Sequence, residues 1–423
     1  MYTRILTFFS ILILAAAGGL AQEPTRLSVD DAIKLALKSN PELRIAAFEI
    51  ARAKSRSRWS GRLKNPDFEF SVNNDFAGLD EDEAVYEIAF SQKFPVTARL
   101  KNESEVRRVQ ILLAEAEFAE QRRHLAYQVD QLSTEMLALQ AKAAQQQLLA
   151  KLNDEIVKFL KDRAAAGEVS SLEINQALLE GRALARETAV LENQALQLGL
   201  KLGRAIGLEP GRAIELTGGL EFPDSRPPRG LEIDSILSHR PDHAAKLIQA
   251  DVAQAELALE NSRRWEDVAV KLFMEREHAV DEPSGLERNT FFGIGFSIPL
   301  PLRDQNEAGI EMAEVEIDAA AATIEASAFA IQSEIEAALA ARSAAWTLAA
   351  EASGEIVKLA EKNLGDFREA HVNGQASLLQ VQRAQEQLLE IQTASTDLER
   401  DYHLADAAVR FVAARHASIE TKP

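Results

Sequence analysis

The residues that could do chemistry in this sequence are histidines and clustered carboxylates. His239 and His243 stand four positions apart, a spacing that places two imidazoles on one face of a helix and is typical of metal ligands. Pro241 lies between them at an expected helix start, and no third ligand is evident nearby. We therefore expect a solvated surface rather than a metal site at this pair.

The remaining reactive side chains form no catalytic arrangement. The acidic run 80–83 favours a soluble loop tip over a cation trap. The chain has 0 cysteines, which excludes disulfides and thiolate metal sites. No glycine motif that could cradle a phosphate is present. We expect no enzyme activity, no cofactor and no bound metal.

The charge balance argues against nucleic acid as a partner. The chain of 423 residues has 47 Lys and Arg against 66 Asp and Glu, a formal charge of −19. Such an acidic protein repels a phosphate backbone. Its apolar content of 46% is enough to fill a core.

The first residues have the layout of a secretory signal peptide. Arg4 precedes an apolar run from Ile5 to Ala17, and small residues approach a cleavage position after Ala21. An N-terminal membrane anchor is the alternative, but Gly18 and Gly19 interrupt the run before about 20 apolar residues are reached. We favour a signal peptide at 1–21 and an exported protein. No later window has a comparable uncharged run.

The rest of the chain reads as two copies of one unit. The Asn40-Pro41-Glu42 pattern returns as Arg240-Pro241-Asp242, and Phe90-Ser91 returns as Phe296-Ser297. The offset drifts by loop-sized steps, which duplication with insertions produces. We expect repeat 1 at 22–207, a Pro- and Gly-rich linker at 208–230, repeat 2 at 231–414 and a C-terminal tail at 415–423.

Each repeat is predicted to run helix, two strands, very long helix, turn, helix. In the first repeat the helices are expected at 28–63, 98–163 and 170–206, and the strands at 67–73 and 84–94. In the second, the long helix is expected at 303–370 and the last helix continues to 414. Heptad spacing supports coiled-coil seams at Leu125, Val129, Leu132, Met136, Leu139 and Ala143, and at Val381, Ala384, Leu388 and Ile391.

The strands combine period-two apolar patterning with proline stops. Tyr86, Ile88 and Phe90 share one face of their strand, and Pro95, Pro299 and Pro301 end the strands because proline has no backbone N–H for a ladder. Their length is near the roughly 9–11 residues that cross an outer membrane. Four strands cannot close a barrel, so several chains would have to share one. Four half-buried strands of an ordinary soluble sheet are the alternative.

Taken together, these features resemble the TolC-type outer-membrane efflux duct family. The resemblance covers nearly all of the mature chain and rests on LSVDDAIKLALKSNPEL, FSQKFP, FSIPLPL, the Gly167 and Gly374 turns, and the two-copy order. It implies a mainly α fold with a small β part, namely a long coiled-coil α-barrel plus a trimeric transmembrane β-barrel with four strands per chain. FSIPLPLRDQNEAG looks most like the heavy-metal efflux branch.

The resemblance also implies partners and a location. A homotrimer in the outer membrane would extend into the periplasm and meet a periplasmic adaptor and an inner-membrane pump at its tip. The expected adaptor-docking residues are Gly167, Ser171, Leu172, Gly374, Ser377 and Leu379. The pore-constriction candidates are Glu173, Gln380 and Arg383, of which the last two depart from the acidic residues of other members.

The sequence thus predicts the outer-membrane channel of a tripartite efflux system that conducts substrate passively. Heavy-metal cations are the favoured substrate and drugs a second one. Two alternatives stay open, a periplasmic coiled-coil spacer with no channel and a duct for polypeptide secretion.

Overall fold

The structure is a computed structural model that describes residues 25–74, 84–167, 169–228, 230–281, 285–352 and 355–414. The expected signal peptide at 1–21, the acidic run 80–83 and the tail 415–423 lie outside the described residues. The chain divides into two compact units. Unit 1 combines Met1–Asn40, Gln128–Asp224 and Thr347–Leu404, and unit 2 combines Pro41–Tyr127, Ser225–Trp346 and Ala405–Pro423.

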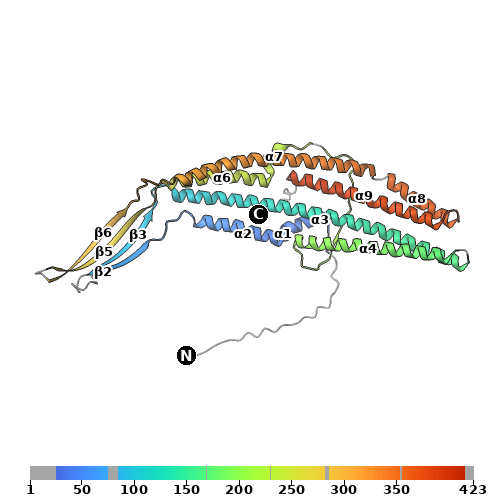
Figure 1. Cartoon of the computed structure of the whole chain (residues 1–423), viewed down its shortest axis with the longest axis horizontal. Helices are drawn as coiled ribbons and strands as arrows, with labels where there is room; N and C mark the ends of the chain where they lie inside the picture. The colour runs from blue at the N-terminus through green and yellow to red at the C-terminus, as the bar shows by residue number, and fades with distance from the viewer. Residues whose placement is uncertain are drawn as a thin grey trace, which may run out of the picture. The chain divides into compact units, whose positions relative to one another are not determined.

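The fold is predominantly helical, as Figure 1 shows. The described helices are α1 (Val29–Ser39), α2 (Pro41–Trp59), α3 (Arg99–Ala165), α4 (Ser171–Ile206), α5 (Ile233–His239), α6 (Pro241–Ser262), α7 (Glu307–Ala352), α8 (Glu355–Val372) and α9 (Leu378–Val412). The very long helix predicted at 98–163 is confirmed as α3, whose 67 residues give it a length of about 100 Å.

Two helix predictions need correction. The single helix expected at 28–63 is wrong, because it breaks at Asn40, whose extended ψ of 125° is what a residue before proline prefers. Its second part, α2, ends at Trp59, just before Gly61 turns the chain with a positive φ of 65°. The long helix expected at 303–370 begins at Glu307, after Asn306 adopts a φ of 61°, and residues 353–354 between α7 and α8 lie outside the described part.

Seven of the ten predicted heptad positions are buried, and Leu132, Leu139 and Ile391 are half-buried. Val129, Met136 and Ala143 of α3 are buried, and so are Val381, Ala384 and Leu388 of α9. In unit 1 a core cluster joins α3, α4, α8 and α9 through aliphatic side chains that include Leu160, Ala177 and Leu364. In unit 2 a second cluster joins α5, α7 and the end of α9 through Ile236, Ile335 and Val409.

Six strands occur among the described residues, one pair more than the four per chain that were predicted for a shared barrel. They are β1 (Thr25–Leu27), β2 (Asp67–Asn74), β3 (Ala84–Phe94), β4 (Ile214–Leu216), β5 (Val268–Asp281) and β6 (Gly285–Ser297). The extra pair, β1 and β4, forms a small parallel sheet in unit 1. The segment expected to be only a linker therefore contains a strand.

The other four strands form one antiparallel sheet in unit 2, in the order β2-β3-β5-β6. Paired residues share a face, and one row across the sheet reads Phe68, Phe90, Leu272 and Ile294. All four of these side chains are exposed in the single chain. The opposite face carries Lys271, which forms ion pairs with Glu69 (3.0 Å) and Glu87 (2.5 Å). The first face is thus apolar near the proline ends of the strands and carries Arg276 farther along. The opposite face carries this charged group of Lys271 together with Phe273 and Phe291.

The strands end where the prolines stand. β3 ends at Phe94, directly before Pro95, and β6 ends at Ser297, two residues before Pro299. Inside the sheet, Gly293 lies opposite Phe273, and a Cβ on this glycine would come within 2.3 Å of the phenylalanine ring.

Among the described residues, no helix is both long enough and apolar enough to cross a membrane.

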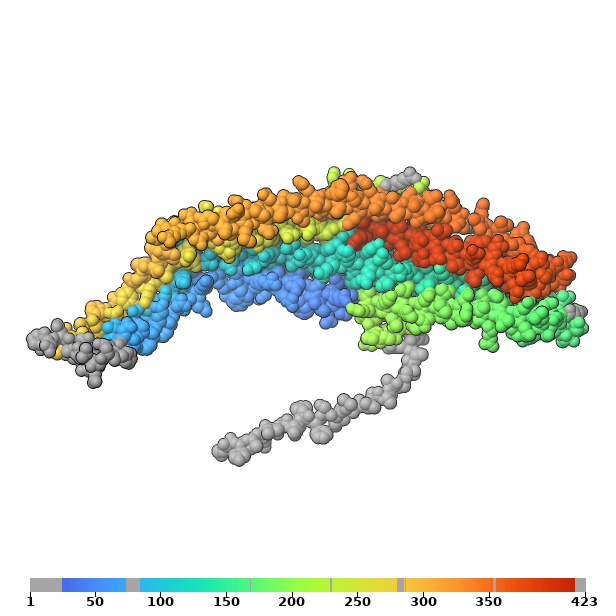
Figure 2. Space-filling view, viewed as in Figure 1, coloured from blue at the N-terminus to red at the C-terminus, as the bar shows by residue number. Residues whose placement is uncertain are grey.

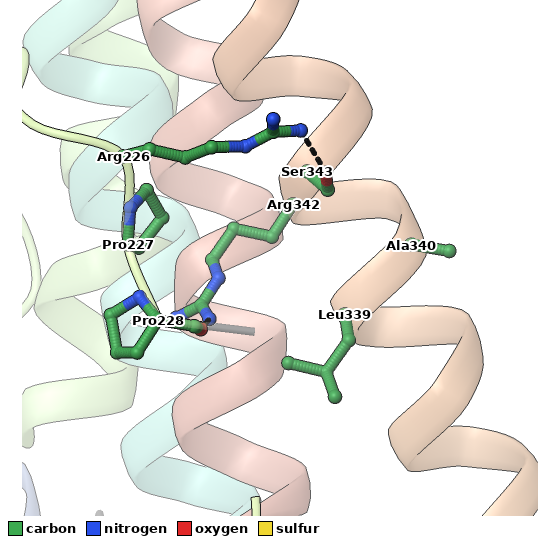
Figure 3. Close-up of a pocket in the computed structure, with 7 residues that line it drawn as sticks. All are labelled: Arg226, Pro227, Pro228, Leu339, Ala340, Arg342 and Ser343. Carbon is green, nitrogen blue, oxygen red and sulfur yellow. Dashed lines mark hydrogen bonds between the residues drawn. The ribbon is translucent and has the colours of Figure 1, made fainter. Parts of the chain in front are cut away.

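In unit 2, two arginines form hydrogen bonds that connect the segment before α5 to α7. Arg226 donates to the hydroxyl of Ser343 over 2.7 Å, as Figure 3 shows. Arg342 donates to the carbonyl of Pro228 over 2.6 Å and pairs with Asp406 at 3.1 Å. Both arginines, Ser343 and Pro228 line a cavity of about 300 Å³, together with Pro227. Since its polar groups hold the segment in place, we interpret this cavity as structural.

Candidate functional site

The first candidate site residues lie in the turn between α3 and α4. Gly167 adopts a φ of 78°, a left-handed conformation that side chains disfavour. The hydroxyl of Ser170 then accepts a hydrogen bond from the backbone N–H of Leu172 over 3.1 Å. This N-cap starts α4 at Ser171, so a glycine stop and a serine start complete the reversal.

The turn between α8 and α9 also combines a glycine of positive φ with an N-cap serine, and its cap has more hydrogen bonds. Gly374 adopts a φ of 74°. Ser377 and Gln380 form a reciprocal capping box, in which the Ser377 N–H donates to Oε1 of Gln380 (2.8 Å) and the Gln380 N–H donates to the Ser377 hydroxyl (3.4 Å). Nδ1 of His371 also donates to the carbonyl of Ala376 over 2.9 Å. The turn is therefore held by its own side chains.

The two turns lie side by side in unit 1. The ring of Phe159 on α3 meets the ring of His371 on α8 edge to face, with 6.0 Å between centroids. Arg368 on α8 pairs with Glu155 on α3 at 2.8 Å. Phe367 packs against the core cluster that α3, α4, α8 and α9 share. Figure 1 shows both turns at the same end of this unit.

The leucines at these turns divide into buried and exposed. Leu378 is 4% exposed and belongs to the core cluster, whereas its neighbour Leu379 is 55% exposed. Leu172 is 64% exposed. Ser171 and Ser377 are exposed as well. Apolar side chains left outside at both turns are the kind of surface that a protein partner covers.

Of the three pore-constriction candidates, Glu173 and Gln380 lie in the first turns of α4 and α9, and Arg383 lies in the second turn of α9. Glu173 is half-buried, and Gln380 and Arg383 are exposed. The side chain of Gln380 is engaged in the cap of Ser377. An S-x-x-Q spacing in the sequence is the signal that could have identified this capping role in advance.

Of the two histidines that were expected on a solvated surface, one is exposed and the other is buried. His239 is exposed and its Nδ1 donates to the carbonyl of Ser235 over 2.7 Å. His243 is buried, so the solvated-surface interpretation is wrong for it, and its Nδ1 is 3.3 Å from the hydroxyl of Ser327. In the ranges that the structure covers, no three His, Cys, Asp or Glu side chains are grouped closely enough to hold a metal ion.

A buried ionic cluster in unit 2 escaped the sequence reasoning. Arg240 and Arg123 are each 2% exposed, and both contact Asp242. Arg240 also pairs with Glu334 at 2.9 Å, and Arg123 with Glu120 at 2.7 Å. Burial alone would raise the pKa of Asp242, but the hydrogen bonds from Arg240 and the charge of Arg123 outweigh it and hold this pKa below its ordinary value.

Arg123 of this cluster also contacts an aromatic residue, Phe411. The guanidinium of Arg123 lies 3.9 Å from the ring centroid of Phe411 and donates to the Phe411 carbonyl over 2.8 Å. The ring of Tyr127 stacks on that of Phe411, with 4.5 Å between the two centroids. These contacts are a cation–π and hydrogen-bond network of structural type.

Comparison with known proteins shows that the chain is similar to outer-membrane efflux proteins. The family model for outer membrane efflux proteins matches it over two segments, residues 32–208 and 233–415. The cobalt-zinc-cadmium resistance protein CzcC of Cupriavidus metallidurans is 25% identical over 298 residues, which cover 70% of this chain and 68% of CzcC.

Solved structures show the same fold. CusC, whose structures concern folding and transmembrane channel formation, matches with a TM-score of 0.72 at 18% identity, over 93% of this chain and 95% of CusC. The outer-membrane channel CmeC of Campylobacter jejuni matches with a TM-score of 0.69 at 14% identity, over 91% of this chain and 85% of CmeC.

Proposed function

The chain belongs to the outer membrane efflux protein family, and on that premise we propose how its parts act. It is the outer-membrane channel component of a tripartite efflux system. Substrate moves passively through a water-filled duct, while a partner pump supplies the energy. No chemical step by the duct itself is part of this proposal.

The observation that carries the proposal is the two-faced sheet with open edges. Its first face is apolar near the proline ends and suits lipid there, and the charged group of Lys271, Glu69 and Glu87 on the opposite face suits water. Strands β2 and β6 are its edges, and each unpaired backbone group in lipid would cost several kcal/mol. Copies of the chain therefore complete one another's sheet, and the family resemblance makes the assembly a trimer with a shared transmembrane barrel.

The two-repeat organisation is part of the proposal. The family model matches twice, at 32–208 and 233–415, which supports repeats at 22–207 and 231–414. The paired turns at Gly167 and Gly374 and the paired N-caps at Ser170 and Ser377 also support it.

The turns are proposed as the adaptor-docking end of the duct. Gly167, Ser171 and Leu172 form one docking turn, and Gly374, Ser377 and Leu379 form the other. The exposed Leu172 and Leu379 give the adaptor an apolar contact, and the inner-membrane pump is reached through it or at the tip. Of the constriction candidates, we favour Glu173 and Arg383, because the Gln380 side chain is held by its cap.

Heavy-metal cations are the proposed substrate. CzcC is named for cobalt, zinc and cadmium resistance, and it supports this choice over drugs. The test is growth of a strain lacking the gene, against zinc, cobalt, cadmium, copper and a drug panel. We expect increased sensitivity to at least one metal that the restored gene reverses. Equal sensitivity of mutant and parent to every metal would contradict the metal assignment.

The same strains separate the duct from the spacer alternative. A duct is recovered in the outer-membrane fraction, and a Leu172→Asp/Leu379→Asp variant is expected to keep that location and lose resistance. A spacer is recovered in the soluble periplasmic fraction, and that result would contradict the duct itself.

A further inference from the structure

A groove in unit 1 lies between α4 and α9, with α3 as its floor. Figure 2 shows α3 flanked by these two helices on one face of the unit. The groove has a volume of about 660 Å³. Small-molecule sites generally have about 300–1,000 Å³, so the groove is large enough to take an organic ligand.

Its rim is acidic and partly uncompensated. Glu180 of α4 and Glu386 and Glu390 of α9 line it, and over the described part of the chain none of the three forms an ion pair. Burial raises the pKa of Glu180, and the nearby charges of Glu386 and Glu187 raise it further. A ligand that brings positive charge would relieve both effects.

In contrast to these three glutamates, Asp397 in the same groove already has cationic partners. Asp397 is held by Lys142 at 2.7 Å and Arg400 at 2.5 Å. The fold thus neutralises one end of the groove and leaves Glu180, Glu386 and Glu390 open to an external cation.

Two buried amides give an independent sign of a missing ligand. Gln385 is 3% exposed and lines the groove, yet neither its Nε2 nor its Oε1 has a hydrogen-bond partner among the described residues. Gln146 is 8% exposed, and while its Nε2 donates to Glu187 over 3.0 Å, its Oε1 is likewise without a described partner. An unmade buried hydrogen bond costs about 1–3 kcal/mol, so donors and acceptors on a ligand would stabilise this floor.

The arrangement favours an elongated cation over a metal ion. Within the described ranges, no three acidic or histidine side chains converge as metal ligands. Glu386 and Glu390 are spaced about 6 Å apart along α9, and Glu180 stands on α4 at the other side of the groove, so the three carboxylates are spread over both walls. Between the acidic groups the floor is apolar, with Leu149 and Leu184 buried in it.

We propose that this groove binds an organic polycation, with protonated amines on Glu180, Glu386 and Glu390 and carbon segments on Leu149 and Leu184. Amine N–H groups donate to the free Oε1 atoms of Gln385 and Gln146. The inference does not rest on the proposed function, because it concerns binding to the protein and not transport through it.

The test is isothermal titration calorimetry of spermine into the purified full chain, in an uncharged detergent at about 0.15 M salt, where diffuse attraction is screened. Glu180→Gln/Glu386→Gln should weaken spermine binding about tenfold or more. Gln385→Leu should weaken it severalfold, because the buried amide no longer accepts. The matched control is Glu314→Gln/Glu325→Gln, which removes two exposed charges of α7 and should bind spermine like the wild type.

Loss of folding cannot mimic this result, since removing the charge of Glu180 relieves repulsion and the variant should melt no lower than the wild type. Absence of spermine binding would overturn the proposal. So would equal weakening by the control pair, which indicates diffuse charge, or displacement of spermine by an equal concentration of Zn²⁺, which indicates a metal site.

Discussion

Two helix junctions with the same local pattern are stabilised by different physics. In unit 1, Asn40 before Pro41 is 5% exposed and its Nδ2 donates to the carbonyl of Ala205 over 2.8 Å. In unit 2, Arg240 before Pro241 is 2% exposed and forms ion pairs with Asp242 and Glu334. The first junction is neutral and the second is ionic, so we expect them to respond differently to truncation and to pH.

The larger effect of truncation is expected at the ionic junction. Arg240→Ala removes a buried guanidinium and leaves the half-buried Asp242 with one cation fewer, and we expect a loss of about 2–3 kcal/mol in the free energy of unfolding. Asn40→Ala is the matched truncation of the neutral junction and should cost about 1–2 kcal/mol. Thermal unfolding of both purified variants, followed by circular dichroism, checks the order. Equal losses would contradict the distinction between the junctions.

The neutral junction has its own sensitive position at Gly207, which caps α4. Its φ is 75°, and a Cβ there would lie 2.3 Å from the carbonyl oxygen of Ser39. Gly207→Ala should therefore cost about 3 kcal/mol, from left-handed strain together with the clash. Gly167→Ala is the control, since no described atom lies within 4 Å of its Cβ position and only about 1 kcal/mol of strain remains. A Gly207→Ala protein that melts like Gly167→Ala would show that the close approach to Ser39 is wrong.

The ionic junction should also fail in acid. Because the pKa of Asp242 is lowered from 3.8, its stabilisation is complete above that value and is lost as the pH falls further. We expect Asp242→Asn to melt lower at pH 7 and to lose less on acidification than the wild type. Melting curves from about pH 6 to pH 3 test this, with Asn40→Ala expected to parallel the wild type. If the melting temperature of Asp242→Asn falls with pH as steeply as that of the wild type, Asp242 is not the source of the acid sensitivity.

The smallest effect has the opposite sign and lies on α6, the helix that begins at Pro241. Burial raises the pKa of Glu256 from 4.5, and neighbouring Glu316 adds to it, so this carboxylate destabilises the fold increasingly as the pH rises through its ordinary pKa. Glu256→Gln should raise stability at pH 7 by about 0.5 kcal/mol, since the group is partly solvated. The gain should vanish near pH 4 in the same melting assay. A destabilised variant at pH 7 would mean that Glu256 has an unrecognised favourable partner.

Local patterns predicted the elements well, because their physical causes are local. The heptads marked Met136 and Leu388 as buried, and alternation placed Tyr86 and Phe90 on one face of β3. Pro41 could also have indicated the break at Asn40, since proline is favoured in the first turn of a helix.

Contacts between distant parts could not be predicted in this way. Glu334 reaches Arg240 across 94 positions. Glu180 and Glu386 line one groove although every element from β4 to α8 stands between α4 and α9 in the chain. Only the packing of helices decides which carboxylates meet. Glu386 and Glu390 stand four positions apart in the sequence, but nothing in the sequence indicates that Glu180 lies across the groove from them.

In the proposed duct, one chain cannot seal its sheet against lipid, and neighbouring chains complete it. Native mass spectrometry of the purified protein, released from detergent micelles, tests this most directly. We expect the mass of three chains. A stable single chain that stays in solution without detergent would contradict it.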